Sequence, residues 1–164
     1  MFFARVSRFM GDGHIRLRPL RVFDAPYLRD RLRDKDMLRT SGLSAPAYSS
    51  WPVLWWWIKK RFMLSYCIEH ESQRIGFVGL YNLRLAGSAE ITLAIFDKSL
   101  RHHGYGSRAF RLLAENLQRR SVVRKLLVRV RRDNFDAVSF WKKLGFSEAG
   151  RLDGIINMYM DLDA

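Results

Sequence analysis

Residues 101–109, RHHGYGSRA, combine two glycines with basic side chains in a pattern typical of anion binding. Gly104 and Gly106 lie where a helix is expected to begin, although glycine costs a helix about 1 kcal/mol relative to alanine. The first N–H groups of a helix have no internal partner, and a glycine turn lets an oxygen, most often of a phosphate, approach them. A glycine turn without a ligand is the alternative interpretation. The flanking basic side chains are Arg101, His102, His103 and Arg108.

Hydrophobic periodicity indicates the elements that hold this turn. Before it, alternating patterns predict strands at 14–20, 63–70, 74–85 and 89–96, and two helices are expected at 24–35 and 51–62. After it, apolar residues three and four apart predict helices at 106–120 and 135–144, and strands are expected at 125–132 and 156–162. The strand–helix–strand succession from 89 to 132 favours one parallel pair in a mixed sheet.

Size and charge limit the class of protein. The chain has 164 residues, which suits a single domain over 1–164, and a formal net charge of +13. Because the positive charge is spread along the chain, it would attract a small polyanion as well as a nucleic acid. A nucleic-acid-binding module stays open as a less favoured reading, since the usual recognition motifs are missing.

The remaining composition suggests an ordinary globular protein. The single cysteine, Cys67, is expected to be a buried residue without a chemical role. The N-terminal segment carries too much charge for a secretory signal, and no apolar run approaches the roughly 20 residues of a membrane-spanning helix. A soluble, cytoplasmic protein without a membrane partner is therefore expected.

Several segments together resemble the GNAT acyltransferase superfamily. RHHGYG matches its R/Q-x-x-G-x-G/A pyrophosphate loop, and NFDAVSFWKKLGF at 134–146 is similar to its second signature. HIRLRPLRVFDAPYL at 14–28 and AEITLAIFDKSLRHHGYGSRA at 89–109 resemble its ribosomal-protein N-acetyltransferase branch. The resemblance covers about 14 to 162 and implies an α/β (α+β) GNAT fold. That fold is a mixed, mostly antiparallel sheet with splayed fourth and fifth strands and about four flanking helices.

The resemblance also implies an N-acetyltransferase with acetyl-CoA as cosubstrate and no metal. Main-chain N–H groups from His102 to Ser107 would hold the pyrophosphate, and the end of the fourth strand would pair with the pantetheine arm. Asn134 would hydrogen-bond the arm, although it would equally cap a helix, and Phe140 and Trp141 would pack beside it or in the core. The implied cofactor-binding residues are Ala94, Ile95, Phe96, Arg101, His102, His103, Gly104, Tyr105, Gly106, Ser107, Asn134, Phe140 and Trp141.

The implied reaction is direct attack of a primary amine on a thioester, which needs a base for the amine. Glu90 is the candidate base, since it stands where some family members carry a catalytic carboxylate. An ion pair with an arginine, a role in binding the amine, or a chain of waters acting as base are the alternatives. Many members place a tyrosine where this chain has Trp141, so the acid that protonates the thiolate is not evident. Tyr105 and Tyr159 are possible substitutes, and a thiolate can also leave unassisted.

The acceptor pocket is expected from the variable segment 40–62 together with a loop at 150–155. The three consecutive tryptophans at 55–57 cover a wide arc of a helix, so at least one of them should be exposed or line a cavity. The acceptor would be a protein N-terminus, for example on a ribosomal particle, or a small amine such as a nucleotide-linked amino sugar. The protein would be a monomer or a homodimer. A catalytically inactive acetyl-CoA sensor is the main alternative function.

Overall fold

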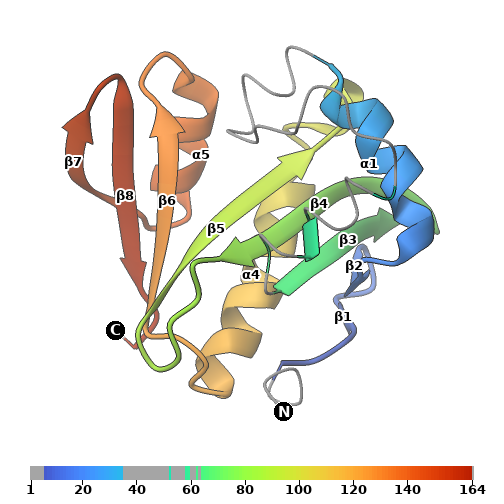
Figure 1. Ribbon diagram of the computed structural model, residues 1–164, viewed down its shortest axis with the longest axis horizontal. Coiled ribbons are helices and arrows are strands. Elements are labelled where there is room, and N and C mark those ends of the chain that lie inside the picture. Colours follow the sequence, from blue (N-terminus) through green and yellow to red (C-terminus); the bar gives the residue numbers. More distant parts are fainter. Residues whose placement is uncertain (1–5, 35–51, 53–57, 60–61, 63, 164) are drawn as a thin grey trace.

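A computed structural model describes residues 6–34, 52, 58, 59, 62 and 64–163 (Figure 1). Its described strands form one eight-stranded sheet in the order β1-β2-β3-β4-β5-β6-β8-β7. The strands are β1 (Met10–Gly11), β2 (Arg16–Pro19), β3 (Leu64–His70), β4 (Gln73–Tyr81), β5 (Ser88–Ile95), β6 (Lys125–Arg131), β7 (Ser147–Leu152) and β8 (Ile155–Asp161). The helices are α1 (Ala25–Leu32), α4 (Tyr105–Arg119) and α5 (Phe135–Lys143), with short 3₁₀ turns η2 (Val22–Asp24) and η3 (Lys98–Leu100).

The sheet is mixed, as the sequence predicts. Described neighbouring strands pair antiparallel except β5 and β6, which are parallel and are joined through α4. Only three residue pairs, Ser88 to Glu90 with Lys125 to Leu127, join these two strands. Beyond Glu90 they separate, and Figure 1 shows β5 and β6 diverging from their common lower end. The fourth and fifth strands expected from the sequence, at 89–96 and 125–132, are β5 and β6, so the predicted splay is present.

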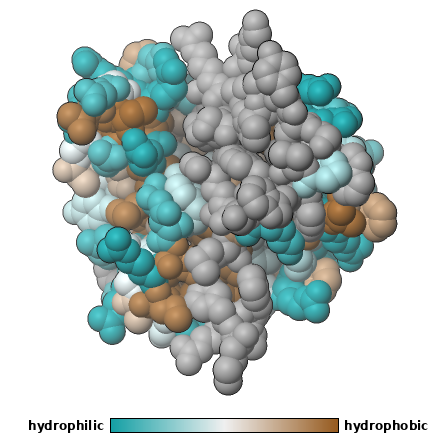
Figure 2. All heavy atoms as spheres, in the orientation of Figure 1, coloured by the Kyte–Doolittle hydropathy of each residue, from teal (hydrophilic) through white to brown (hydrophobic). Residues whose placement is uncertain are grey.

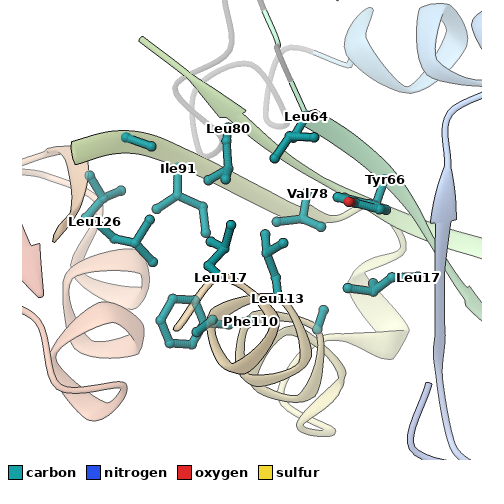
Figure 3. Packing of buried hydrophobic residues seen from close by; sticks show 14 of the residues in the cluster. Leu17, Leu64, Tyr66, Val78, Leu80, Ile91, Phe110, Leu113, Leu117 and Leu126 are labelled. Atoms are coloured by element: carbon teal, nitrogen blue, oxygen red, sulfur yellow. The ribbon is translucent and has the colours of Figure 1, made fainter. Parts of the chain in front are cut away.

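Two apolar clusters cover the two faces of the sheet. The larger one includes the buried stripe of α4 at Phe110, Leu113 and Leu117, the spacing from which this helix is predicted. Figure 3 shows these three side chains gathered against the sheet. The smaller cluster, with Leu28 of α1 and Ala94 of β5, lies on the other face. The faces are called the α4 face and the α1 face below.

A buried ion network fixes β2 and η2 to the sheet on the α1 face. Arg18 is 6% exposed and binds Asp24 through two hydrogen bonds of 2.7 and 2.8 Å, and Glu69 through one of 2.6 Å. Arg16 adds two further bonds to Glu69, of 3.1 and 2.7 Å. Asp24, the first residue of the helix expected at 24–35, precedes α1 but makes no side-chain cap bond there. Its carboxylate instead neutralises the buried guanidinium.

Of the C-terminal hairpin, only the second strand is predicted from the sequence, at 156–162, and it is β8. Residues 147–152 form the edge strand β7, and the segment 150–155, expected as a loop of the acceptor pocket, is strand and turn. Asp153 and Gly154 have φ of +50° and +75°, the left-handed values of a tight two-residue hairpin turn. Asp-Gly is a strong hairpin signal, so this strand was visible in the sequence.

Some predictions fall outside the described residues. The helix expected at 51–62 and the tryptophans at 55–57 lie almost entirely there, so three of about four expected helices are described. In the described part of the chain, no helix is both long and apolar enough to cross a membrane. Figure 2 shows polar residues over much of the described surface in this view, with small apolar groups between them.

Candidate active site

A cavity of about 890 Å³ opens where β5 and β6 diverge. Its walls come from β5, the turn before α4, β6, and the segment from Asn134 to Lys143. Side chains of both faces contribute, since Leu93 meets the start of α4 whereas Ala94 belongs to the cluster on the α1 face. The cavity therefore reaches through the splayed sheet from one face to the other.

The turn at one end of the cavity has the backbone of an anion-binding loop. His102 has φ of +63° and Gly104 has φ of +83°, and Gly104 is the N-cap of α4. Within the helix the N–H of Arg108 donates to Gly104 O at 3.0 Å. The N–H groups before it have no partner inside α4, and the helix dipole adds positive potential at the same place. This donor set suits a diphosphate.

The two glycines serve different purposes. A Cβ on Gly104 would meet no protein atom within 4 Å, so the protein leaves open space there. Gly104 is required for its left-handed φ, which side chains rarely adopt. A Cβ on Gly106 would lie 3.3 Å from Leu93 Cδ2 and 3.4 Å from the Phe140 ring. Gly106 thus lets α4 pack closely against β5 and α5, a role that the sequence pattern does not distinguish from ligand binding.

Basic residues of the turn are partly engaged by the protein. Arg101 donates from Nε to Ile95 O at 2.9 Å and from a terminal nitrogen to Phe96 O at 3.4 Å, which ties the turn to the end of β5. His102 and Ser107 line the cavity. His103 does not line it, and its Nδ1 lies 2.8 Å from Arg101 O. Arg108 is paired with Asp12 at 2.9 Å, so the positive potential of the turn comes mainly from Arg101 and the helix terminus.

The main chain of β5 presents alternate residues to the gap. Phe96 N–H donates to Ile75 O of the β4 side at 2.9 Å, so in an antiparallel ladder Ala94 also faces β4 with its main chain. Leu93 and Ile95 then turn their main-chain groups toward the gap. Phe96 lies outside the cavity lining, so its expected main-chain contact with a pantetheine arm does not fit this geometry. Leu93, which the sequence reading missed, fits it.

The second segment, at the start of α5, forms the opposite wall. Asn134 caps α5 by accepting a hydrogen bond from Ala137 N–H at 3.1 Å. The helix-capping role is thus present, and Asn134 also lines the cavity. Trp141 is 4% exposed and packs edge-to-face on Phe110, Phe140 and Phe146 at 5.0–5.9 Å between ring centroids. Its indole is a core residue with one edge on the cavity, as the packing alternative predicted.

Glu90 lies in the cavity wall on the α1 face, two residues from Thr92 and four from Ala94. Tyr81 is its direct cross-strand neighbour on β4. Asn82 Nδ2 donates to Glu90 Oε1 at 2.7 Å. Glu90 Oε2 is buried, and no described residue donates a hydrogen bond to it. An acceptor oxygen without a donor, beside a cavity, can take a proton or bind an ammonium group.

Tyr105 and Tyr159, the candidate acids that could protonate the thiolate in place of the missing tyrosine, lie in different places relative to the cavity. Tyr105 lines the cavity, and its hydroxyl lies 3.1 Å from His70 Nε2. His70 Nδ1 lies 2.8 Å from His14 O, which can only accept, so in neutral His70 the Nε2 accepts from Tyr105. Tyr159 is not a lining residue. Tyr81 also lines the cavity beside Glu90, and the sequence does not indicate it because its place opposite Glu90 depends on the β4–β5 register.

Comparison with protein families gives a match over residues 30–146, to the acetyltransferase (GNAT) family. The chain belongs to this family. The match includes β5, the turn and both walls of the cavity, so acetyl-CoA is the acetyl donor of this GNAT enzyme. The turn before α4 suits the diphosphate of that donor. Among the described residues, no group of three or more acidic, histidine or cysteine side chains is placed to hold a metal ion.

Solved structures share the GNAT fold over almost the whole chain. RimL, a ribosomal-protein α-N-acetyltransferase in complex with coenzyme A, has 19% identity and a TM-score of 0.79, with 95% of this chain and 99% of that chain covered. Spermidine N-acetyltransferase from Vibrio cholerae, with coenzyme A and spermine, has 19% identity and a TM-score of 0.73, with 92% of this chain and 97% of that chain covered. An aminoglycoside acetyltransferase with coenzyme A has 18% identity and a TM-score of 0.74, with 90% of this chain and 94% of that chain covered. No curated protein matches the sequence.

Proposed function

We propose that this GNAT enzyme transfers the acetyl group of acetyl-CoA directly to a primary amine that reaches the cavity from the α1 face. The observation that carries the proposal is the cavity through the splayed sheet. One end has a helix terminus suited to a diphosphate, and the other has Glu90, whose buried Oε2 accepts no hydrogen bond from a described residue. Donor and acceptor would therefore meet in the gap from opposite faces.

The α4 side would bind the donor. Main-chain N–H groups from His102 to Ser107 would hold the diphosphate, and Leu93 and Ile95 would pair with the pantetheine arm as an added strand. Asn134 and the ring of Phe140 would form the other wall of the arm's channel. Arg101 would act through its bonds to the end of β5, which fix the turn relative to that strand.

Glu90 would serve as the base for the incoming amine. Acetyl-CoA supplies an activated acetyl group, whose carbon–sulfur bond breaks as a carbon–nitrogen bond forms. Glu90 Oε2 would accept the proton that the ammonium group loses, while Asn82 holds Oε1 and fixes the orientation of the carboxylate. The thiolate can leave without an acid or take a proton from water, since Trp141 is packed in the core.

We also infer that residues 1–164 act as one domain, because the eight described strands share a single sheet. The acceptor is proposed to be a protein N-terminus or a small amine. RimL acts on a ribosomal protein and the Vibrio enzyme on spermidine, and both share this fold, so the fold alone does not choose between them.

Two measurements test the proposal. Calorimetry should show coenzyme A binding to the purified protein, and free thiol should appear from acetyl-CoA when a panel of primary amines is added. Binding without thiol release for any amine would contradict the enzyme and favour an acetyl-CoA sensor. Absence of coenzyme A binding would refute the donor site itself.

A further inference from the structure

Strand β6 carries three basic side chains on the α1 face: Lys125, Arg129 and Arg131. Lys125 Nζ lies 3.3 Å from Asp161, and Arg131 binds Asp133 through two hydrogen bonds of 2.8 and 3.0 Å. No acidic side chain in the described part of the chain pairs with Arg129, whose direct cross-strand neighbour on β8 is the neutral Asn157. Arg129 is thus the basic residue of this strand whose charge is not compensated by a described neighbour.

Arg129 is an exposed residue in the wall of the same cavity as Glu90. Leu127 is the direct partner of Glu90 across the β5–β6 ladder, so the two side chains share a face. Arg129 is two residues farther, on that same face and roughly 7 Å along the strand. A carboxylate with an unpartnered oxygen and an uncompensated guanidinium therefore lie on adjacent strands of the α1 face.

This position separates Arg129 from the expected donor phosphates. The turn before α4 meets Leu93, whose side chain lies on the α4 face, whereas Arg129 alternates with the buried Val128 and Val130 of that face. In Figure 1 no described helix covers β6, β8 and β7 on the viewer's side, with α5 behind β6. Arg129 therefore faces the side from which the acceptor is proposed to enter.

We propose that Arg129 binds an anionic group, a carboxylate or a phosphate, on the amine acceptor whose nitrogen lies at Glu90. The inference rests on the proposed function, because it names the class of the acceptor. A guanidinium presents N–H donors in a planar fork that matches two oxygens of such a group. The spacing along β6 selects an anion several bonds from the amine, as in the residue after a peptide N-terminus or in a phosphorylated amino sugar. The net charge of +13 would attract these acceptors over neutral ones.

Pairs of amines that differ in one charge test this acceptor class. The first pair is two C-terminally amidated peptides that begin Ser-Asp or Ser-Asn, and the second is glucosamine 6-phosphate and glucosamine. At low ionic strength the wild type should favour the anionic member of at least one pair by about tenfold or more in kcat/KM, mainly through KM. A preference within the peptide pair would indicate that Arg129 binds a carboxylate, and a preference within the glucosamine pair would indicate a phosphate.

Two variants separate Arg129 from general electrostatics. Arg129→Gln should bring the preference to about threefold or less. Arg132→Gln removes the same charge from an exposed neighbour outside the cavity, and it should retain the preference of the wild type. Circular dichroism should give both variants the wild-type melting temperature within a few degrees, since both side chains are exposed.

The outcomes distinguish this inference from the proposed function. Equal acetylation of both members of each pair, or a preference that survives in Arg129→Gln, overturns the inference while acetyl transfer stands. Coenzyme A binding without acetylation of any of the four amines shows that the acceptor class is wrong. Loss of coenzyme A binding in the wild type would instead overturn the proposed function.

Discussion

Asn82, which directly follows β4, and Glu90 of β5 are joined by a hydrogen bond of 2.7 Å from the amide Nδ2 to Oε1. Asn82 adopts a left-handed φ of +49°, which asparagine tolerates better than most residues. The bond occupies one carboxylate oxygen, and the other, Oε2, is buried and accepts no hydrogen bond from a described residue, in a side chain that lines the cavity. If Glu90 is the base, as we propose, Oε2 can take the proton of the amine without first losing a hydrogen bond to a described residue.

Glu90→Gln should therefore reduce turnover by about 10²–10⁴-fold, the usual contribution of a positioned general base. The isosteric amide keeps the shape of the side chain but cannot take the proton of the amine. Steady-state kinetics should show the loss in kcat, and calorimetry should find coenzyme A affinity within about twofold of the wild type.

Glu115→Gln is the matched control, because Glu115 pairs with Arg119 on the outer surface of α4, away from the cavity. Its turnover should equal that of the wild type. If Glu90→Gln also turns over normally, the base is not Glu90, and a chain of waters becomes the better explanation.

The left-handed glycines offer a second matched pair. Gly104 and Gly154 have φ of +83° and +75°, and a Cβ on either would meet no protein atom within 4 Å. Alanine at each should therefore cost a similar amount of stability, about 1–2 kcal/mol from backbone strain alone. Only Gly104→Ala places its methyl group in the space of the diphosphate turn, so only this variant should weaken coenzyme A binding, by tenfold or more.

Chemical denaturation and calorimetry on both variants check this prediction. Equal losses of stability with a selective loss of affinity support a ligand at the turn. Unchanged coenzyme A affinity in Gly104→Ala would count against main-chain binding of the diphosphate there.

Much of the fold follows from local sequence patterns. The stripe of Phe110, Leu113 and Leu117 predicts α4, and the glycines before it predict where that helix begins. The strand–helix–strand succession predicts the parallel β5–β6 pair. These features are readable because periodicity and turn chemistry act over a few residues.

Features that depend on distant residues were not readable. Asp24 looks like a helix cap, but its carboxylate neutralises Arg18, which only the folded sheet brings to it. Gly106 looks like part of the anion turn, but its close neighbours are Leu93 and Phe140. That Arg129 has no acidic partner among the described residues becomes evident only in the folded sheet, where its cross-strand neighbour on β8 is the neutral Asn157.

Because of the ion network around Arg18, the free energy of unfolding should fall as the solution becomes acidic. Burial is the largest influence on Asp24 and Glu69 and raises their pKa, but hydrogen bonds from Arg18 and other donors outweigh it, so both pKa values lie below their ordinary 3.8 and 4.5. Since the unfolded chain then binds protons before the folded one, this stabilisation is complete above about pH 5 and declines as pH falls through 4. Melting temperatures from pH 7 to pH 3 should follow this curve.

Asp24→Asn should lower the free energy of unfolding at pH 7 by about 3–5 kcal/mol, because it leaves the Arg18 charge buried with a weaker partner. It should also flatten the pH dependence between 5 and 3. Asp30→Asn breaks the exposed pair with Arg29 and should change stability by less than about 1 kcal/mol. Equal effects of the two substitutions would mean that the buried network contributes no more than a surface pair.

Cys67, the single cysteine, gives a readout of global opening. It is 1% exposed, and burial raises the pKa of its thiol to about 12, so the folded protein keeps this thiol protonated at pH 8. A thiol reagent should therefore label one group at once in urea but only slowly in the native protein, at a rate that follows unfolding. Saturating coenzyme A should slow native labelling, since a ligand of the folded state lowers the unfolded population. Asp24→Asn should accelerate it. Rapid native labelling unaffected by coenzyme A would show that Cys67 is reached without unfolding.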